Sequence, residues 1–242
     1  VRRHLAEVFA MKYRFKMYKG DEIKYIGHLD LLVAFQRVIK RANLPIEYSN
    51  GFNPHQQVSF ASPLSLGLTS LAEYGDFELT EDLDTKEVMD RLNEHMPDGL
   101  KILSLTKLKE GVKNTMTSLK RAEYEIYFLK NITAEDIEKN IDGFMAQKEI
   151  LAMKKTKKGI NEADIRPDLF WMKNISEGEK VGFKIQVSSG SVRNLKGETV
   201  AAAFCAYIGK EFNKYEMKCV RSEMLMETED GQFVPLDYEV GI

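Results

Sequence analysis

The feature that most constrains the fold is a repeat: the strands and helices predicted from the sequence follow the same order in the first half and in the second half of the chain. Residues 11–19, MKYRFKMYK, alternate apolar and basic side chains, as in a strand with one buried face. Apolar residues then recur at helical spacing over residues 28–44, and Pro45 ends that pattern. The first half is completed by a strand ending at Phe60, a strand over 73–80, a helix over 85–96 with Thr85 as N-cap, and a strand over 100–108.

The second half repeats this order after a polar stretch at residues 109–118. The patterns predict strands over 122–129, 149–156, 181–189 and 215–227, helices over 134–146 (N-cap Thr133) and 197–212, and an insertion at 157–179. Strand, helix, strand, strand, helix, strand is the order of the ferredoxin-like βαββαβ motif. We therefore expect an α+β protein with two tandem ferredoxin-like domains and antiparallel sheets. The expected bounds are an N-terminal extension at 1–10, domain 1 at 11–110 and domain 2 at 119–242.

Composition favours a globular chain that works inside the cell. Of the 242 residues, 43% are hydrophobic and 30% are charged, which is neither the balance of a disordered chain nor that of a membrane protein. A run of about 18 apolar residues is missing, and the opening VRRHLAEVFA is too interrupted by charge for a secretory signal. Cys205 and Cys219 form no disulfide framework and no metal-ligand pattern. We expect a cytoplasmic protein with no cofactor, no metal and no membrane partner.

The net charge of -2 conceals an uneven distribution of charge along the sequence. Residues 11–57 contain eight Lys or Arg against four Asp or Glu, whereas residues 71–98 contain two against ten. The basic segment suits an anionic ligand, and the acidic segment suits a basic protein partner. Ordinary solvated surfaces explain both segments equally well.

Several short sequence words occur together in this chain: HLD at 28–30, KRANLP at 40–45, YSNGFNPH at 48–55, SFASPLSLG at 59–67 and GINEADIRP at 159–167. In this combination the sequence resembles the radical SAM-linked protein family, which occurs beside or fused to B12-binding-type radical SAM proteins. The resemblance implies a radical SAM protein as partner and a context of RNA processing and ribosome biogenesis, but no reaction. The chain lacks a C-x₃-C-x₂-C cluster, so it does not itself hold the iron–sulfur cluster of such an enzyme. Gly27 stands where many relatives have Ser.

The predicted helix at 28–44 has two groups of candidate ligand-binding residues. His28 and Asp30 lie at its N-terminus, where exposed N–H groups can hold a phosphate, although capping and dipole compensation are the simpler roles. Arg37 and Arg41 lie four residues apart on one helix face and can contact two phosphates, or pair with acidic side chains.

The segment YSNGFNPHQQ is the most distinctive in the chain. It interleaves flat rings with amides, a mixture that can stack an unpaired base and hydrogen-bond its edge. The alternative is a structural loop whose Asn side chains bond their own backbone. The candidate contact residues are Tyr48, Asn50, Phe52, Asn53 and His55.

The second half contributes a smaller set of candidates. Lys154 and Lys155 can follow a phosphate backbone just before the ADIRP word. Asp164 and Arg166 either touch the same ligand or hold their own loop in place.

Three hypotheses follow for function. The favoured one is an accessory protein that binds RNA, or an RNA-containing complex such as a ribosomal one, for a partner radical SAM enzyme, with no catalytic activity of its own. The first alternative is a metal-independent endoribonuclease or RNA-modification enzyme that uses His28 and His55 as acid and base. The second is a protein-only adaptor that docks through the acidic segment 71–98.

Overall fold

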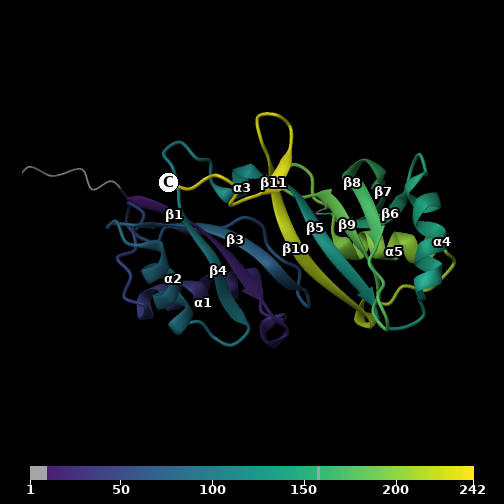
Figure 1. The fold of residues 1–242 in the computed structure, drawn as a ribbon, viewed down its shortest axis with the longest axis horizontal. Coiled ribbons are helices and arrows are strands. Elements are labelled where there is room, and N and C mark those ends of the chain that lie inside the picture. Colours follow the sequence, from purple (N-terminus) through teal and green to yellow (C-terminus); the bar gives the residue numbers. More distant parts are fainter. Residues whose placement is uncertain (1–9, 157–158) are drawn as a thin grey trace, which may run out of the picture. The chain divides into compact units, whose positions relative to one another are not determined.

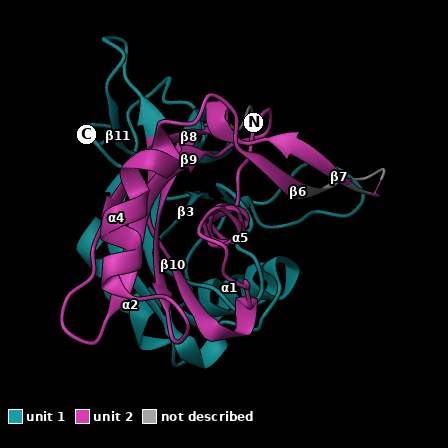
Figure 2. Cartoon of the chain, turned by 90° about the vertical axis from the view of Figure 1, so that its right-hand side faces the viewer, with its two compact units in different colours: residues 1–119, 226–242 teal, residues 120–225 magenta. Residues whose placement is uncertain are grey.

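The computed structural model describes residues 10–156 and 159–242, and the chain divides into two compact units (Figures 1 and 2). Unit 1 comprises residues up to 119 together with 226–242, and unit 2 comprises residues 120–225. Helices and strands are mixed in both, and the strand pairs are dominantly antiparallel. The C-terminal segment 226–242 belongs to unit 1, whereas the sequence analysis grouped it with the second domain.

Unit 1 contains a sheet with the strand order β4-β1-β3-β2. Phe77 of β3 pairs with Tyr13 of β1 on one edge and with Val58 of β2 on the other, which fixes this order. The elements are β1 (Met11–Lys19), a 3-10 turn (Asp21–Ile23), α1 (His28–Arg41), β2 (Val58–Phe60), β3 (Thr69–Leu79), α2 (Thr85–Glu94), β4 (Leu100–Lys107), α3 (Thr115–Ser118) and β11 (Phe233–Pro235).

The core of unit 1 lies between the sheet and helices α1 and α2. Side chains alternate along β1, so Tyr13, Phe15 and Met17 are fully buried against Phe35 of α1 and Leu92 of α2. Burying a side chain of this size contributes about 1.5–3 kcal/mol. The intervening basic residues of β1 therefore lie on the opposite face of the sheet.

Unit 2 has the corresponding strand order, β10-β5-β9-β8. Phe144 and Phe204, one from each of its two α-helices, pack edge to face with ring centroids 5.4 Å apart, and Phe183 of β9 packs on Phe204. Both helices therefore cover one face of this sheet. The elements are β5 (Leu119–Phe128), α4 (Ala134–Met145), β6 (Leu151–Thr156), β7 (Gly159–Asp164), a 3-10 turn (Arg166–Asp168), β8 (Leu169–Asn174), β9 (Val181–Ser188), α5 (Gly197–Tyr207), a 3-10 turn (Lys214–Glu216) and β10 (Met217–Glu227).

The structure corrects the predicted second strand of the second half. Strand β6 lies where a strand was expected, but it pairs with β7 to form a separate two-stranded ribbon. The strand that pairs with β9 is β8, which lies inside the segment predicted to be an insertion. Which segment joins the main sheet depends on pairing with β9, a long-range contact that the local pattern of residues 151–156 does not reveal.

Helix ends differ from the prediction for local backbone reasons. Helix α1 ends at Arg41 because Asn43 adopts a positive φ of 50°, and α5 ends at Tyr207, two residues before Gly209 with φ 69°. The N-cap of α2 is Asp84 and not Thr85. Thr133 caps α4 as predicted, in a full capping box with Asp136.

None of the helices in the described part of the chain is long and apolar enough to cross a membrane.

Candidate functional site

Residues 48–56, which we call the Phe52 loop, form a closed excursion before β2. Tyr48 and Gln56 form an antiparallel bridge at its base. The Ser49 N–H donates to the His55 carbonyl at 2.8 Å, and the Ser49 hydroxyl lies 2.7 Å from His55 Nδ1. The His55 N–H also donates to Ser49 Oγ at 3.1 Å. These bonds hold the two ends of the loop together, so its tip is presented from a fixed base.

The tip of the Phe52 loop presents an aromatic ring to solvent. Gly51 adopts φ 123°, a backbone conformation that favours glycine, and Phe52 beside it is fully exposed. Asn50 and Asn53 on either side are exposed too, and Tyr48 is about half exposed. The Phe52 ring therefore contributes nothing to the core and is free to contact a ligand.

The base of the Phe52 loop lies against the middle of α1. Gln56 is buried, and its amide nitrogen donates to the Gln36 carbonyl at 3.4 Å. Arg37 follows Gln36 directly, and Arg37 and Arg41 are both exposed. The structure thus brings the predicted loop and the predicted basic helix into contact through Gln56.

The two histidines of the enzyme hypothesis have different surroundings. The His28 ring is half-buried and packs edge to face on Phe60 with centroids 5.9 Å apart. His55 is exposed and bonds Ser49. Phe60 ends β2 whereas His55 precedes it, so the contacts of the two rings lie at opposite ends of that strand. Asp30 is exposed in the first turn of α1. Joint acid and base catalysis by the histidines stays a prediction.

The candidates of the second half lie at the base of the β6–β7 ribbon. Asp164 Oδ1 accepts from the N–H groups of Ile150 and Arg166, both at 2.9 Å, and these bonds lower the pKa of Asp164 below its ordinary 3.8. The Arg166 guanidinium donates to the carbonyls of Met145 (3.1 Å) and Leu169 (2.9 Å). Both side chains therefore act as a clasp for their own loop, the alternative that the sequence left open. The side chains of Lys154 and Lys155 lie outside the described part of the structure.

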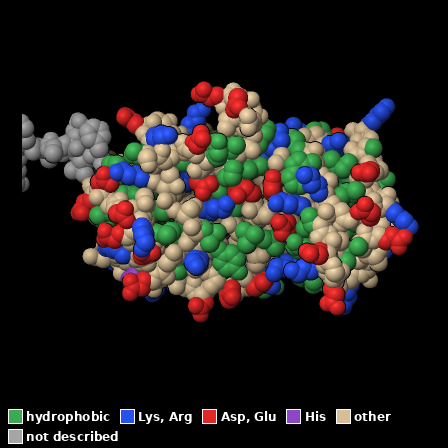
Figure 3. All heavy atoms as spheres, viewed as in Figure 1, with side chains coloured by type: hydrophobic (Ala, Val, Ile, Leu, Met, Phe, Trp, Pro, Cys, Tyr) green, Lys and Arg blue, Asp and Glu red, His purple; other side chains and the backbone are tan. Residues whose placement is uncertain are grey.

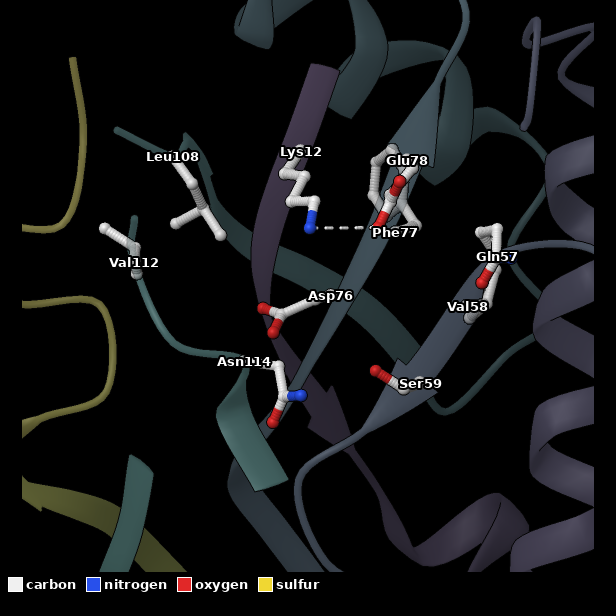
Figure 4. Close-up of a pocket in the computed structure, with 10 residues that line it drawn as sticks. All are labelled: Lys12, Gln57, Val58, Ser59, Asp76, Phe77, Glu78, Leu108, Val112 and Asn114. Carbon is white, nitrogen blue, oxygen red and sulfur yellow. Dashed lines mark ion pairs between the residues drawn. The ribbon is translucent and has the colours of Figure 1, made fainter. Parts of the chain in front are cut away.

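A polar cavity on unit 1 escaped the sequence analysis. Its volume is about 400 Å³, and it lies on the face of the sheet away from α1 and α2 (Figure 4). Lys12 Nζ and Glu78 Oε1, paired across β1 and β3, lie 3.4 Å apart at one side of it. The lining residues are Lys12, Gln57, Val58, Ser59, Asp76, Phe77, Glu78, Leu108, Val112 and Asn114. The alternation of β1 and β3 could have indicated this polar face, but not the segment 108–114 that encloses it.

A buried ion pair supports one wall of the cavity. Arg14 Nε donates to Asp76 Oδ1 at 2.8 Å, and the Arg14 side chain is fully buried. The same guanidinium donates to the carbonyls of Leu236 (2.7 Å) and Lys113 (2.8 Å). Asp76 Oδ2 accepts from the Thr115 N–H at 2.7 Å. Asp76 is therefore held in one position by groups from two segments of unit 1, β1 and α3.

Metal and thiol chemistry find little support in these side chains. Among the described residues, no group of three or more His, Cys, Asp or Glu side chains could hold a metal ion. Cys205 and Cys219 are buried, and burial raises the pKa of both thiols, that of Cys205 to about 11. Neither thiol is poised as a nucleophile.

A family model described as "Uncharacterized protein conserved in bacteria (DUF2344)" matches residues 12–197. The chain belongs to this family. The match covers most of both units, including the Phe52 loop and the β6–β7 ribbon. No curated protein matches the sequence.

Solved structures similar to this DUF2344 chain include the following three. A Cbf5-Nop10-Gar1 complex matches with 11% identity and a TM-score of 0.46, over 87% of this chain and 49% of that chain. An archaeal box H/ACA sRNP Nop10-Cbf5 complex matches with 8% identity and a TM-score of 0.40, over 85% and 46%. An unknown protein from Galdieria sulphuraria matches with 11% identity and a TM-score of 0.25, over 87% and 96%. The DUF2344 chain spans about half the length of the first two.

The sheet of unit 2 in this DUF2344 chain carries pairs of basic and aromatic side chains on the face away from its helices. The sequence patterns did not indicate these pairs. The Arg121 guanidinium lies 3.6 Å from the Phe170 ring centroid, and Lys173 Nζ lies 5.2 Å from that of Trp171. Arg121 also donates to Gln186 at 2.8 Å. On the face of the molecule seen in Figure 3, basic and acidic side chains are interspersed, unlike the separated charge segments of the sequence.

Proposed function

We propose that this protein binds RNA at an unpaired base through the Phe52 loop and the basic end of α1. We further propose that it acts in the cytoplasm as an accessory to a radical SAM protein and has no catalytic activity of its own. The observation that carries the proposal is the fully exposed Phe52 ring on a loop whose base is closed by the Ser49–His55 bonds.

Stacking explains why such a ring binds a base. Every base has a π face, and stacking on an aromatic side chain contributes about 1–3 kcal/mol per base. The amides of Asn50 and Asn53 beside Phe52 both donate and accept, as the edges of a base require. Because the bonded base of the loop already restrains the chain, less conformational entropy is lost on binding.

The basic end of α1 supplies the complementary interaction with the RNA backbone. Arg37, Lys40 and Arg41 are all exposed in its last two turns, close to the Gln36 carbonyl where the Phe52 loop docks. Arginines there would contact phosphates on either side of the stacked base and make binding dependent on salt. Base stacking and phosphate contact would then come from adjacent parts of unit 1.

The strand orders support the finer proposal of two ferredoxin-like domains. Within each unit the strand order is the fourth, first, third and second of a βαββαβ series, once β6 and β7 are set aside. We propose a first domain close to residues 11–110, after an extension at 1–10, and a second domain that begins near 119 but ends near 225, because the C-terminal segment 226–242 returns to the first.

The partner proposal is supported by the family resemblance and by an exposed apolar stretch on α1. Leu29 and Val33 lie four residues apart on the first half of the helix and are exposed. If this stretch docks the radical SAM protein, Leu29→Asp should abolish co-purification of the two proteins. Leu129→Asp, at a similarly exposed apolar position in unit 2, is the matched control. Undiminished co-purification of the Leu29 variant would rule out this docking stretch.

RNA binding is tested by the fluorescence anisotropy of labelled single-stranded RNA mixed with the full chain. Phe52→Ala should weaken binding about tenfold, and Phe52→Tyr should keep it, because a base stacks on either ring. Tyr215→Ala removes an exposed ring from unit 2 and should leave affinity unchanged. RNA binding that is absent from the wild type, or equal in Phe52→Ala, would overturn the proposal.

Phosphate contact is tested by the salt dependence of the same binding. Replacing both Arg37 and Arg41 by Gln should reduce the slope of log affinity against log salt by about 1.4, since each contact with a single strand contributes about 0.7. Lys86→Gln with Lys139→Gln removes equal charge from exposed positions on α2 and α4 and is the control. An unchanged slope in the arginine variant would exclude α1 from the interface.

A further inference from the structure

We propose that the polar cavity of unit 1 receives a single nucleobase bearing an exocyclic amino group. This inference rests on the proposed function, because the base would belong to the RNA that the Phe52 loop holds. The connection is covalent: Gln57, which lines the cavity, directly follows Gln56, the last residue of that loop. A volume of about 400 Å³ lies within the range of small-ligand pockets, about 300–1,000 Å³.

The walls of the cavity match the two kinds of surface on a base. Leu108 and Val112 provide apolar contact for the flat face of a ring (Figure 4). The polar groups of Gln57, Ser59 and Glu78 lie across the cavity from these two side chains and are available to the edge of the ring. Apolar walls with a few placed polar groups are typical of small-molecule sites.

The polar lining offers both donors and acceptors. Across the described residues, neither the Gln57 amide nor the Ser59 hydroxyl makes a side-chain hydrogen bond. Asn114 Oδ1 accepts from the Thr117 N–H at 2.9 Å, which directs its amide NH₂ to other partners. A base edge presents donors and acceptors side by side, and amide and hydroxyl groups can satisfy both.

The charge of the lining favours a neutral ligand over an anion. Arg14 balances Asp76, and Lys12 balances Glu78, so the lining has no excess positive charge. A phosphate or carboxylate gains little from such a lining, so the phosphates of a bound RNA would stay outside while the uncharged base enters. Glu78 can only accept, so it would favour the amino groups of adenine, cytosine or guanine, each with two N–H donors, over uracil, whose N3–H lies between two carbonyl oxygens that the carboxylate repels.

The wall behind this site is rigid. Asp76 is fixed by Arg14 and by the Thr115 N–H, and it cannot swing to bond the ligand without breaking those contacts. Selectivity is therefore assigned to Glu78, whose only close partner in the cavity, Lys12, is largely exposed and able to move. A pre-formed wall also reduces the entropy lost on binding.

The pocket is tested with free nucleosides, which lack phosphates and do not need the loop. Adenosine, cytidine and uridine are titrated into the isotope-labelled full chain, and chemical-shift changes are followed by NMR. Adenosine and cytidine should bind about fivefold or more tightly than uridine, since a hydrogen bond to a carboxylate is stronger than one to a neutral group. The shifted resonances should include Gln57, Ser59 and Asn114.

Two variants locate the binding. Ser59→Phe fills the cavity and should abolish nucleoside binding. Glu78→Gln keeps the shape, so it serves even if the bulky variant does not fold, and it should remove the preference over uridine. If folded Ser59→Phe still binds nucleosides, or if Glu78→Gln still prefers adenosine and cytidine over uridine, the proposal that the cavity receives a base is overturned.

A third variant separates this inference from the proposed function. Phe52→Ala should weaken RNA binding but leave nucleoside binding intact. If nucleosides bind the wild type and RNA does not, the proposed function fails and the pocket stands. If RNA binds through Phe52 but none of the three nucleosides binds, the pocket fails and the proposed function stands.

Discussion

The two units share a strand order but differ in how they treat the sheet face away from their helices. In unit 1 that face holds the Arg14–Asp76 pair, with the Arg14 side chain fully buried. In unit 2 the corresponding face holds Lys184 between Glu123 and Glu125, at 3.1 and 3.7 Å, with all three side chains 17–28% exposed. Similar architecture thus places one ion pair in the interior and another near water, where removing one partner costs far less.

Chain segments outside the strands cause this difference. In unit 1 the carbonyls of Leu236 and Lys113 reach Arg14, and Asp237 accepts from the hydroxyls of Tyr74 and Ser104, both at 3.0 Å. These residues cover the polar face and satisfy its buried donors. The pairs on the unit 2 face bond mainly to one another, from Tyr127 through Glu125 and Lys184 to Glu123. Segments that cover a polar face therefore bury its charged side chains, which then contribute to the stability of the fold.

The largest effect is expected for Arg14→Met. This change leaves the Asp76 carboxylate buried without its cation, and the free energy of unfolding should fall by about 3–5 kcal/mol. Urea unfolding measures the loss. Trp171 is the chain's only tryptophan and lies in unit 2, so its fluorescence follows that unit while circular dichroism follows both. The urea concentration at the midpoint of unfolding should therefore fall more when unfolding is followed by circular dichroism than when it is followed by fluorescence.

A double-mutant cycle is the control for this prediction. Adding Asp76→Asn to Arg14→Met removes the stranded charge, so the double variant should be more stable than the sum of the single losses implies. Strict additivity of the two changes would show that the ion pair is not the source of the effect.

A smaller effect is expected at the start of α4. Asp136 caps this helix with Thr133 and bonds Lys210, which lowers the pKa of Asp136 to about 2 from its ordinary 3.8. Because the folded pKa is the lower one, this stabilisation is present above about pH 4 and is lost as the pH falls toward 2. Asp136→Asn should cost about 1 kcal/mol at pH 7 and less at pH 2.5. Urea unfolding at both pH values, followed by Trp171 fluorescence, measures the change, and a loss independent of pH would contradict it.

Lys184→Met tests the near-surface counterpart of Arg14. The free energy of unfolding should fall by about 0.2–1 kcal/mol, because solvent already weakens the attraction to Glu123 and Glu125. The same urea experiment at low and high salt measures it, and added salt should shrink the difference from wild type. A loss as large as that of Arg14→Met would erase the proposed contrast between the two faces.

Local patterns predicted the parts of the fold that depend on neighbouring residues. The alternation in residues 11–19 correctly assigned Tyr13, Phe15 and Met17 to the core, and Thr133 was correctly predicted as a helix cap. The prediction failed where contacts with distant segments of the chain determine whether a side chain is buried. Alternation alone placed Arg14 on a solvent face, but residues more than 200 positions later cover it.

The same reasoning applies to the candidate site. The Phe52 loop was recognisable because its rings, amides and glycine are contiguous in sequence, and its exposure fits that composition. The polar cavity was not, since its lining comes from β1, β2, β3 and the segment 108–114. The choice between β6 and β8 as the strand beside β9 was likewise a matter of long-range pairing, which the local sequence of the two segments could not reveal.

The smallest expected effect concerns how the first helix of each unit begins. Helix α4 has a capping box, whereas α1 follows Gly27, which has no side chain to cap it. Gly27 adopts an extended conformation (φ -73°, ψ 166°), and a Cβ there would meet Asp30 Oδ2 at an ordinary 3.4 Å. Gly27→Ser should therefore stabilise the chain by a few tenths of a kcal/mol. Gly27→Ala adds the Cβ without the hydroxyl, and if thermal unfolding shows it to be as stable as Gly27→Ser, the gain does not come from capping.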